Sequence, residues 1–72
     1  MHQLDCRDLR CPLPIVRISQ AVRDLDVGDC LQVLATDPAF RADLSAWAEM
    51  TGNELVSFEK DASEQRAVVR VR

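Results

Sequence analysis

The spacing of apolar residues changes along the chain, and each change marks an expected element. Between residues 12 and 25, Ile15, Ile18, Val22 and Leu25 follow one another at spacings of three, four and three. This spacing predicts a helix over residues 12–25 with one apolar stripe. Because such a stripe must pack against another element, it supplies one contact face of the expected core.

A second helix is expected from residue 38 onward. Asp37 is a favourable N-cap residue, and Pro38 suits the first helical position. Gly52 fits the residue just past the end of this helix. At spacings of four and three, one helical face would hold Phe40, Leu44 and Trp47.

The remaining apolar and alternating stretches indicate strands. The four expected strands are residues 2–6, 30–36, 54–60 and 66–72. Leu4 and Cys6 would share one face of the first. The second, with the sequence CLQVLAT, is almost continuously apolar, which predicts a central position with much of both faces buried. The DASEQ stretch predicts a hairpin connection between the last two strands.

The expected order of elements is therefore β-α-β-α-β-β. Two crossovers imply some parallel pairing, and the final hairpin adds an antiparallel pair. Two helices cover only one face of a four-stranded sheet, so we predict an α/β protein: a two-layer α/β sandwich with a mixed sheet and one open face. The polar residues that suit this open face are Gln32, Ser57, Glu59, Arg70 and Arg72. With 72 residues, the chain is expected to form one domain over 1–72.

Composition and charge narrow the function classes. Nine Lys and Arg against twelve Asp and Glu give a net charge of −3, which disfavours direct nucleic-acid binding. No run approaches the ~20 apolar residues of a membrane helix, and the first ten residues lack the apolar segment of a signal peptide. Three cysteines, an odd number without a regular framework, favour a reduced thiol state. We expect a cytoplasmic protein and a monomer.

Cys11 is the residue that indicates chemistry, because it stands at the start of the first expected helix. In this interpretation Cys11 is the N-cap and Pro12 the first helical residue. The partial positive charge of a helix N-terminus favours the thiolate, which is the nucleophilic form of cysteine. Arg10 would act in the same direction, and Asp8 would oppose it.

The two prolines that follow Cys11 restrict the available hydrogen-bond donors. Pro12 and Pro14 have no backbone N–H, so the N–H of Leu13 is the expected partner of the sulfur. The prolines also fix the local backbone. The sequence therefore predicts a thiol held at a rigid, exposed corner, which suits a sulfur atom that is passed between proteins.

On these residues the sequence resembles the TusA (SirA-like) family of small sulfur carrier proteins. The matching stretches are LDCRDLRCPLPIVR, GDCLQVLATDP and TGNELV, and the most specific part is CPLP at residues 11–14. The resemblance implies a βαβαββ two-layer fold and a motif cysteine, here Cys11, that carries sulfur as a persulfide. It also implies a cysteine desulfurase or a rhodanese-type enzyme as donor. Downstream acceptor proteins in the family serve tRNA thiolation, molybdenum cofactor synthesis or sulfur oxidation.

The chain departs from the family pattern at two positions. Asp8 stands where family members usually have glycine, which leaves the geometry of this turn and the charge near the thiol open. Ala48 stands where many members have a cysteine on the second helix, so no second helical thiol is expected.

The other candidate residues favour structural interpretations. Cys6 and Cys30 are expected to fill the core or a sheet face, although Cys6 could also form a disulfide with Cys11. A zinc site would need both of these cysteines with Cys11 and His2, but no Cys-x-x-Cys pair exists, so we expect no metal and no cofactor. Arg17 lies on the polar side of the first helix, where contact with an acidic partner or an anionic sulfur species and ordinary solvation are equal alternatives.

The leading hypothesis is a sulfur carrier with Cys11 as the persulfide-bearing nucleophile and the motif residues around it in support. No acid–base dyad is expected near Cys11, because His2 is distant in sequence. Such a site suits sulfurtransferase-type exchange, and whether the chain counts as an enzyme stays open. Two alternatives remain: a protein-interaction or regulatory module in which Cys11 only caps a helix, and a thiol redox protein using Cys6 and Cys11.

Overall fold

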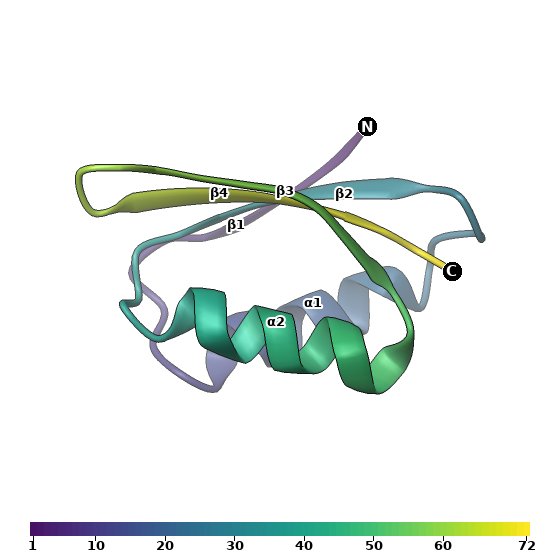
Figure 1. Cartoon of the computed structure of the whole chain (residues 1–72), viewed down its shortest axis with the longest axis horizontal. Coiled ribbons are helices and arrows are strands. Elements are labelled where there is room, and N and C mark those ends of the chain that lie inside the picture. Colours follow the sequence, from purple (N-terminus) through teal and green to yellow (C-terminus); the bar gives the residue numbers. More distant parts are fainter.

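The computed structural model describes residues 1–72 and has six elements in the predicted order, β-α-β-α-β-β. The strands are β1 (His2–Cys6), β2 (Cys30–Ala35), β3 (Glu54–Asp61) and β4 (Glu64–Arg70), and the helices are α1 (Leu13–Val22) and α2 (Phe40–Thr51). Both helices lie on the same side of the sheet, and the other side is open (Figure 1). The predicted two-layer α/β sandwich is therefore confirmed.

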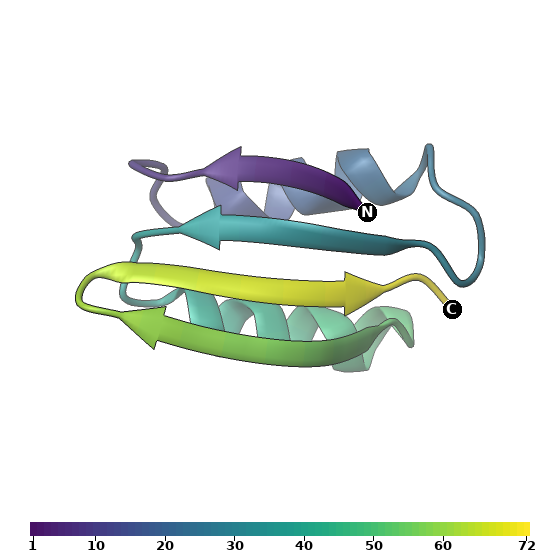
Figure 2. The ribbon, with the colours of Figure 1, turned by 90° about the horizontal axis from the view of Figure 1, so that it is seen from above.

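The sheet has the strand order β1-β2-β4-β3 (Figure 2). β1 pairs with β2 in parallel, and β4 runs antiparallel to both β2 and β3, so the sheet is mixed as predicted. Cys6 is the register partner of Ala35, so β1 and β2 end at the same edge of the sheet. The segments that follow these two strands therefore start side by side.

The predicted central position of β2 is confirmed, but its expected burial on both faces holds for one face only. Leu31, Val33 and Ala35 are buried under the helices. The alternate side chains, Cys30, Gln32 and Leu34, are half-buried on the open face, because no second layer covers that side.

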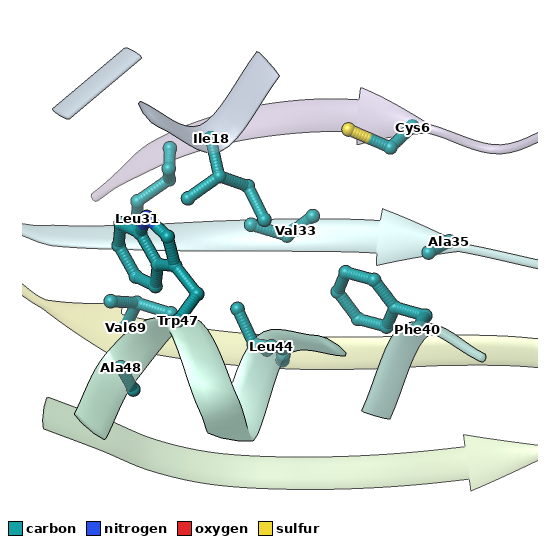
Figure 3. Close-up of a cluster of buried hydrophobic side chains, with 11 residues drawn as sticks. Cys6, Ile18, Leu31, Val33, Ala35, Phe40, Leu44, Trp47, Ala48 and Val69 are labelled. Carbon is teal, nitrogen blue, oxygen red and sulfur yellow. The ribbon is translucent and has the colours of Figure 1, made fainter. Parts of the chain in front are cut away.

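The core lies between the sheet and the helices, and the predicted apolar faces build it (Figure 3). Ile18 of α1 is fully buried, and the rest of its predicted stripe packs around the same cluster. From α2 the core receives Phe40, Leu44, Trp47 and Ala48. The indole N–H of Trp47 donates a hydrogen bond to the hydroxyl of Ser19 (3.0 Å), which links the two helices.

The ends of the helices differ from the predicted ends. α1 ends at Val22 rather than near Leu25, because the following N–H groups of Asp24 and Leu25 bond to carbonyls three residues back. This tightened turn no longer follows the α-helical pattern. Gly52 ends α2 as predicted, with φ of 78° and its N–H donated to the carbonyl of Ala48 (2.9 Å).

The final hairpin is tighter than predicted. β3 extends to Asp61 and β4 begins at Glu64, so only Ala62 and Ser63 form the connection. Ala62 has a φ of 56°, a left-handed conformation that two-residue hairpin turns require. The sequence prediction placed the start of the last strand two residues later, because Ala62-Ser63 is not one of the Asn-Gly, Asp-Gly or Gly-Gly pairs that indicate a two-residue turn. No helix of the structure is both long and apolar enough to cross a membrane.

Candidate functional site

Cys11 is exposed in the loop between β1 and α1, but it is not the N-cap residue that the sequence predicted. α1 begins at Leu13, with Pro12 as its N-cap. The N–H of Leu13 donates to the carbonyl of Arg10 (2.8 Å), and the first α-helical bond runs from Val16 N–H to Pro12 carbonyl (3.1 Å). The turn made by the first of these bonds places Cys11 one residue before the cap.

The expected hydrogen bond from the Leu13 N–H to the sulfur is therefore wrong. This donor is already used by the carbonyl of Arg10. The partner that the structure gives Cys11 comes instead from the connection between β2 and α2. There, Oδ2 of Asp37 accepts the backbone N–H of Cys11 (2.9 Å).

Asp37 holds two loops at once. Its Oδ2 binds Cys11, and its Oδ1 accepts the N–H of Ala39 (3.3 Å). Ala39 is the N-cap of α2, so the helix starts two residues later than predicted and Asp37 is not its N-cap. One carboxylate oxygen of Asp37 thus binds the backbone just before α2, and the other fixes the backbone at the thiol.

Two more hydrogen bonds hold these loops, one to the sheet and one between the loops themselves. The side chain of Gln65, which is buried in β4, donates to the carbonyl of Asp37 (2.7 Å). The N–H of Asp8 donates to the hydroxyl of Thr36 (2.9 Å). The β1–α1 and β2–α2 loops therefore form one connected edge, and Cys11 is held on it.

The electrostatic surroundings of the thiol are acidic. The sulfur of Cys11 and carboxylate oxygens of Asp37 and Asp43 all lie within 4.8 Å of one another. A hydrogen bond to Asp43 is the largest cause that raises the pKa of Cys11, followed by desolvation and by the charges of Asp43 and Asp37. All of these causes raise the pKa of Cys11, whereas the sequence predicted that the helix terminus and Arg10 would favour the thiolate.

Neither of the predicted arginines is among the groups that shift the pKa of Cys11. Arg10 is exposed and lines a shallow recess with Asp8 and Asp37, among other loop residues. Arg17 is exposed on α1, and its charge acts on Cys6. The apolar side chains of Leu13 and Val16 are also exposed, by 48% and 43%. The helix that follows Cys11 thus exposes apolar and basic side chains, whereas the side chains placed beside the sulfur are acidic.

Asp43 is the residue that sequence reasoning missed. It is an acidic residue in the first turn of a helix, a common position that stabilises a helix by itself. Nothing in its immediate sequence indicates contact with a cysteine far earlier in the chain. The available signal was topological, because the parallel pair of β1 and β2 brings both following loops to one edge.

The other thiols and His2 are placed apart from this cluster. Cys6 is fully buried at the end of β1, where burial is the main cause that raises its pKa, so its structural interpretation is confirmed. Cys30 lies at the opposite end of β2 as the register partner of Arg70. The Nε2 atom of His2 lies 3.9 Å from the Oδ2 atom of Asp29, so His2 is paired with a different residue.

The group of metal-ligand types that the structure does bring together is Cys11 with Asp37 and Asp43. Both carboxylate oxygens of Asp37 already accept backbone N–H groups. We therefore interpret the cluster through the chemistry of the thiol and assign no metal to it.

Comparison with known proteins places this fold and this loop in a family. The family model described as sulfurtransferase TusA matches residues 2–71, and the chain belongs to this family. The sulfur carrier protein TusA of Allochromatium vinosum is 35% identical over 69 residues, which is 96% of this chain and 91% of that protein. A longer relative from Aquifex aeolicus is 39% identical over 67 residues, which are 93% of this chain. The chain spans about a third (34%) of that relative's length.

A solved structure agrees with the arrangement of the elements. The crystal structure of a SirA-like protein from Desulfitobacterium hafniense superposes with a TM-score of 0.84 at 26% identity. The match covers 97% of this chain and 96% of that chain. The similarity therefore extends over both layers of the sandwich.

Proposed function

We propose that this chain is a sulfur carrier that accepts sulfur on Cys11 as a persulfide and relays it to a partner protein. The observation that carries the proposal is the exposure of Cys11 within the CPLP motif, on a loop edge fixed by Asp37 and Gln65. Membership of the TusA family and relatives named as sulfur carriers support the same role.

The exchange needs only thiol chemistry. The sulfur of Cys11 attacks the outer sulfur of a donor persulfide, and the bond between the two donor sulfurs breaks. The donor leaves as a thiol, and Cys11 keeps the transferred sulfur as a persulfide. A thiol of the acceptor then removes this sulfur by the same exchange, which regenerates Cys11.

The proposed donor is a cysteine desulfurase or a rhodanese-type enzyme, and the proposed acceptor is a protein of a downstream sulfur pathway. tRNA thiolation, molybdenum cofactor synthesis and sulfur oxidation are the three candidate pathways. Leu13, Val16 and Arg17 are exposed on α1, the helix that follows Cys11, and their spacings of three and four place them on one helical face, which we propose as a contact surface for such partners. We further propose that the chain works as one domain and as a monomer in the cytoplasm, without a cofactor.

Intact-mass spectrometry under non-reducing conditions tests the proposal. The protein is incubated with a cysteine desulfurase, pyridoxal phosphate and cysteine, and a parallel sample receives a rhodanese-type donor. We expect wild type to gain the mass of one sulfur atom. Cys11→Ser should gain nothing, and Cys6→Ser and Cys30→Ser should load like wild type. A Cys11→Ser variant that loads as well as wild type would contradict the proposal.

The two competing functions predict different results in the same samples. An interaction module would capture its partner equally well after Cys11→Ala, and wild type would take up no sulfur. A redox protein using Cys6 and Cys11 would lose two alkylation sites together under mild oxidation. The complete burial of Cys6 disfavours this second alternative, because the thiolate must reach its target to react.

A further inference from the structure

We propose that Asp43 is a positioning residue for sulfur transfer, whose carboxylate holds the proton of the Cys11 thiol in the free carrier. This inference rests on the carrier function proposed above. It assigns to a side chain of α2 the control of when the sulfur becomes a nucleophile.

The carboxylates of Asp37 and Asp43 both lie close to the Cys11 thiol, but they have different hydrogen-bond partners. Asp37 is occupied by backbone donors of Cys11 and Ala39, so it fixes the position of the loop. Asp43 lies in the first turn of α2, is half-buried, and places a carboxylate oxygen within 4.8 Å of the Cys11 sulfur. The ion pairs of this structure involve the carboxylates of Asp5, Asp29, Glu54 and Glu64, and neither carboxylate at the thiol is among them.

The surrounding charges do not cancel this effect. The charged groups of the elements around Cys11 are Arg7, Asp8 and Arg10 on its own loop, Asp37 on the β2–α2 loop, Arg17 on α1, and Arg41, Asp43 and Glu49 on α2. None of the four arginines is among the causes that act on the pKa of Cys11. The hydrogen bond to Asp43 and the charges of Asp43 and Asp37 all raise the pKa of Cys11. A carboxylate accepts a hydrogen bond from a neutral thiol and repels a thiolate, so it favours the protonated form.

Holding the proton has a direct chemical consequence. In the loading step the S–H bond of Cys11 breaks, and its sulfur bonds to the outer sulfur of the donor persulfide. The donor's S–S bond breaks, and its departing sulfur takes the electron pair and the proton. Because Asp43 keeps the proton on Cys11 until this exchange, the free carrier reacts slowly with other electrophiles. Deprotonation is then driven within the complex of carrier and donor.

Alkylation by iodoacetamide tests this role without any sulfur donor, and the neutral reagent avoids charge effects on the encounter. Trypsin places the three cysteines on separate peptides, residues 1–7, 11–17 and 24–41. The alkylation rate of Cys11 is therefore measured by itself as a function of pH. For Asp43→Asn we expect the profile to move to lower pH and the rate at pH 7 to rise roughly threefold. The larger thiolate fraction outweighs the lower nucleophilicity of a more acidic thiol, whose Brønsted coefficient is about 0.4–0.5.

Two variants separate this role from a general effect of charge or folding. Asp24→Asn removes the same charge beyond the far end of α1 and should leave the Cys11 profile unchanged. Asp43→Glu retains an acidic group in the first turn of α2 and should stay close to wild type. An Asp43→Asn profile that superposes on wild type overturns the proposal, since a merely structural Asp43 would alter stability without moving this profile.

Sulfur loading in the same samples distinguishes the two proposals. Wild type that loads while Asp43→Asn keeps the wild-type alkylation profile overturns only the role of Asp43. Wild type that takes up no sulfur from either donor overturns the carrier function, and with it the part of Asp43 in transfer. Wild type that loads, together with a shifted Asp43→Asn profile, supports both.

Discussion

Asp8 sits in a left-handed backbone conformation, with φ of 66°, in the loop that leads to Cys11. This conformation costs L-residues roughly 1–2 kcal/mol, although aspartate tolerates it better than most. Its N–H still binds Thr36, so the residue serves the loop through its backbone. A glycine at this position would adopt the same angle without that cost.

Replacing Asp8 therefore gives results that depend on the backbone. Asp8→Gly should change the free energy of unfolding by less than about 1 kcal/mol, because relief of strain is offset by the greater entropy of the unfolded chain. Asp8→Val should lower it by about 1–2 kcal/mol, because a β-branched residue strongly resists positive φ. Urea unfolding measures both. A valine variant as stable as wild type would mean that this strained conformation is absent in solution.

Asp5 and Arg7 form a pH-dependent pair at the end of β1. Two guanidinium nitrogens and the backbone N–H of Arg7 donate to the Asp5 carboxylate, at 2.9–3.0 Å. The side-chain hydrogen bond is the largest cause that lowers the pKa of Asp5, from 3.8 to about 2. The stabilisation from this pair is complete above pH 3.8 and is lost as the pH falls through about 2.

The pair can be tested by titrating the Asp5 carboxyl signal by NMR. In Arg7→Gln we expect its midpoint to move up from about 2 toward 3.8. Arg66→Gln is the control, because Arg66 carries the same charge on β4 outside the ion pairs of this structure. An Asp5 midpoint that stays near 2 without the Arg7 side chain would show that the backbone alone causes the shift.

At the scale of elements, one hydrogen bond links the two helices beneath the sheet. Trp47, the single tryptophan, is 8% exposed and donates its indole N–H to Ser19. Ser19→Ala should lower the free energy of unfolding by about 1 kcal/mol, because the mostly buried donor loses its partner. Ser45→Ala is the matched control, since Ser45 is exposed on α2 and gains the same helix propensity.

Tryptophan fluorescence during urea unfolding reports directly on this contact. We expect Ser19→Ala to unfold at lower urea concentration than Ser45→Ala and to show an altered native emission. Equal midpoints and unchanged emission would mean that water replaces the serine hydroxyl without loss.

The elements also show why the fold was predictable and part of the site was not. The helix faces and the exposed Cys11 follow from spacing and from residue type, which act locally. The helix starts did not follow, because Leu13 and Ala39 use their N–H groups in bonds to Arg10 and Asp37 that no local pattern reveals. The acidic surroundings of Cys11 also depend on tertiary structure, since Asp43 arrives from another helix.

At the scale of the whole molecule, few residues provide the stability that keeps these loops together. Only 13 of the 72 residues are buried, and one face of the sheet is open. At about 0.05–0.15 kcal/mol per residue, a chain of this length has a free energy of unfolding of roughly 4–11 kcal/mol. A single large truncation in the core therefore removes a large share of the total.

Leu44 and Met50 provide the contrast that tests this statement within one helix. Leu44 is fully buried and Met50 is 86% exposed, although both belong to α2. Leu44→Ala should lower the free energy of unfolding by about 2–5 kcal/mol, and Met50→Ala should change it by less than about 0.5 kcal/mol. Thermal unfolding followed by circular dichroism measures both. Because α2 positions Asp43 beside the thiol, the alkylation rate of Cys11 should also depend more strongly on temperature in Leu44→Ala than in wild type. If Met50→Ala were the more damaging change, Met50 would lie in a contact surface, which contradicts its exposure on α2.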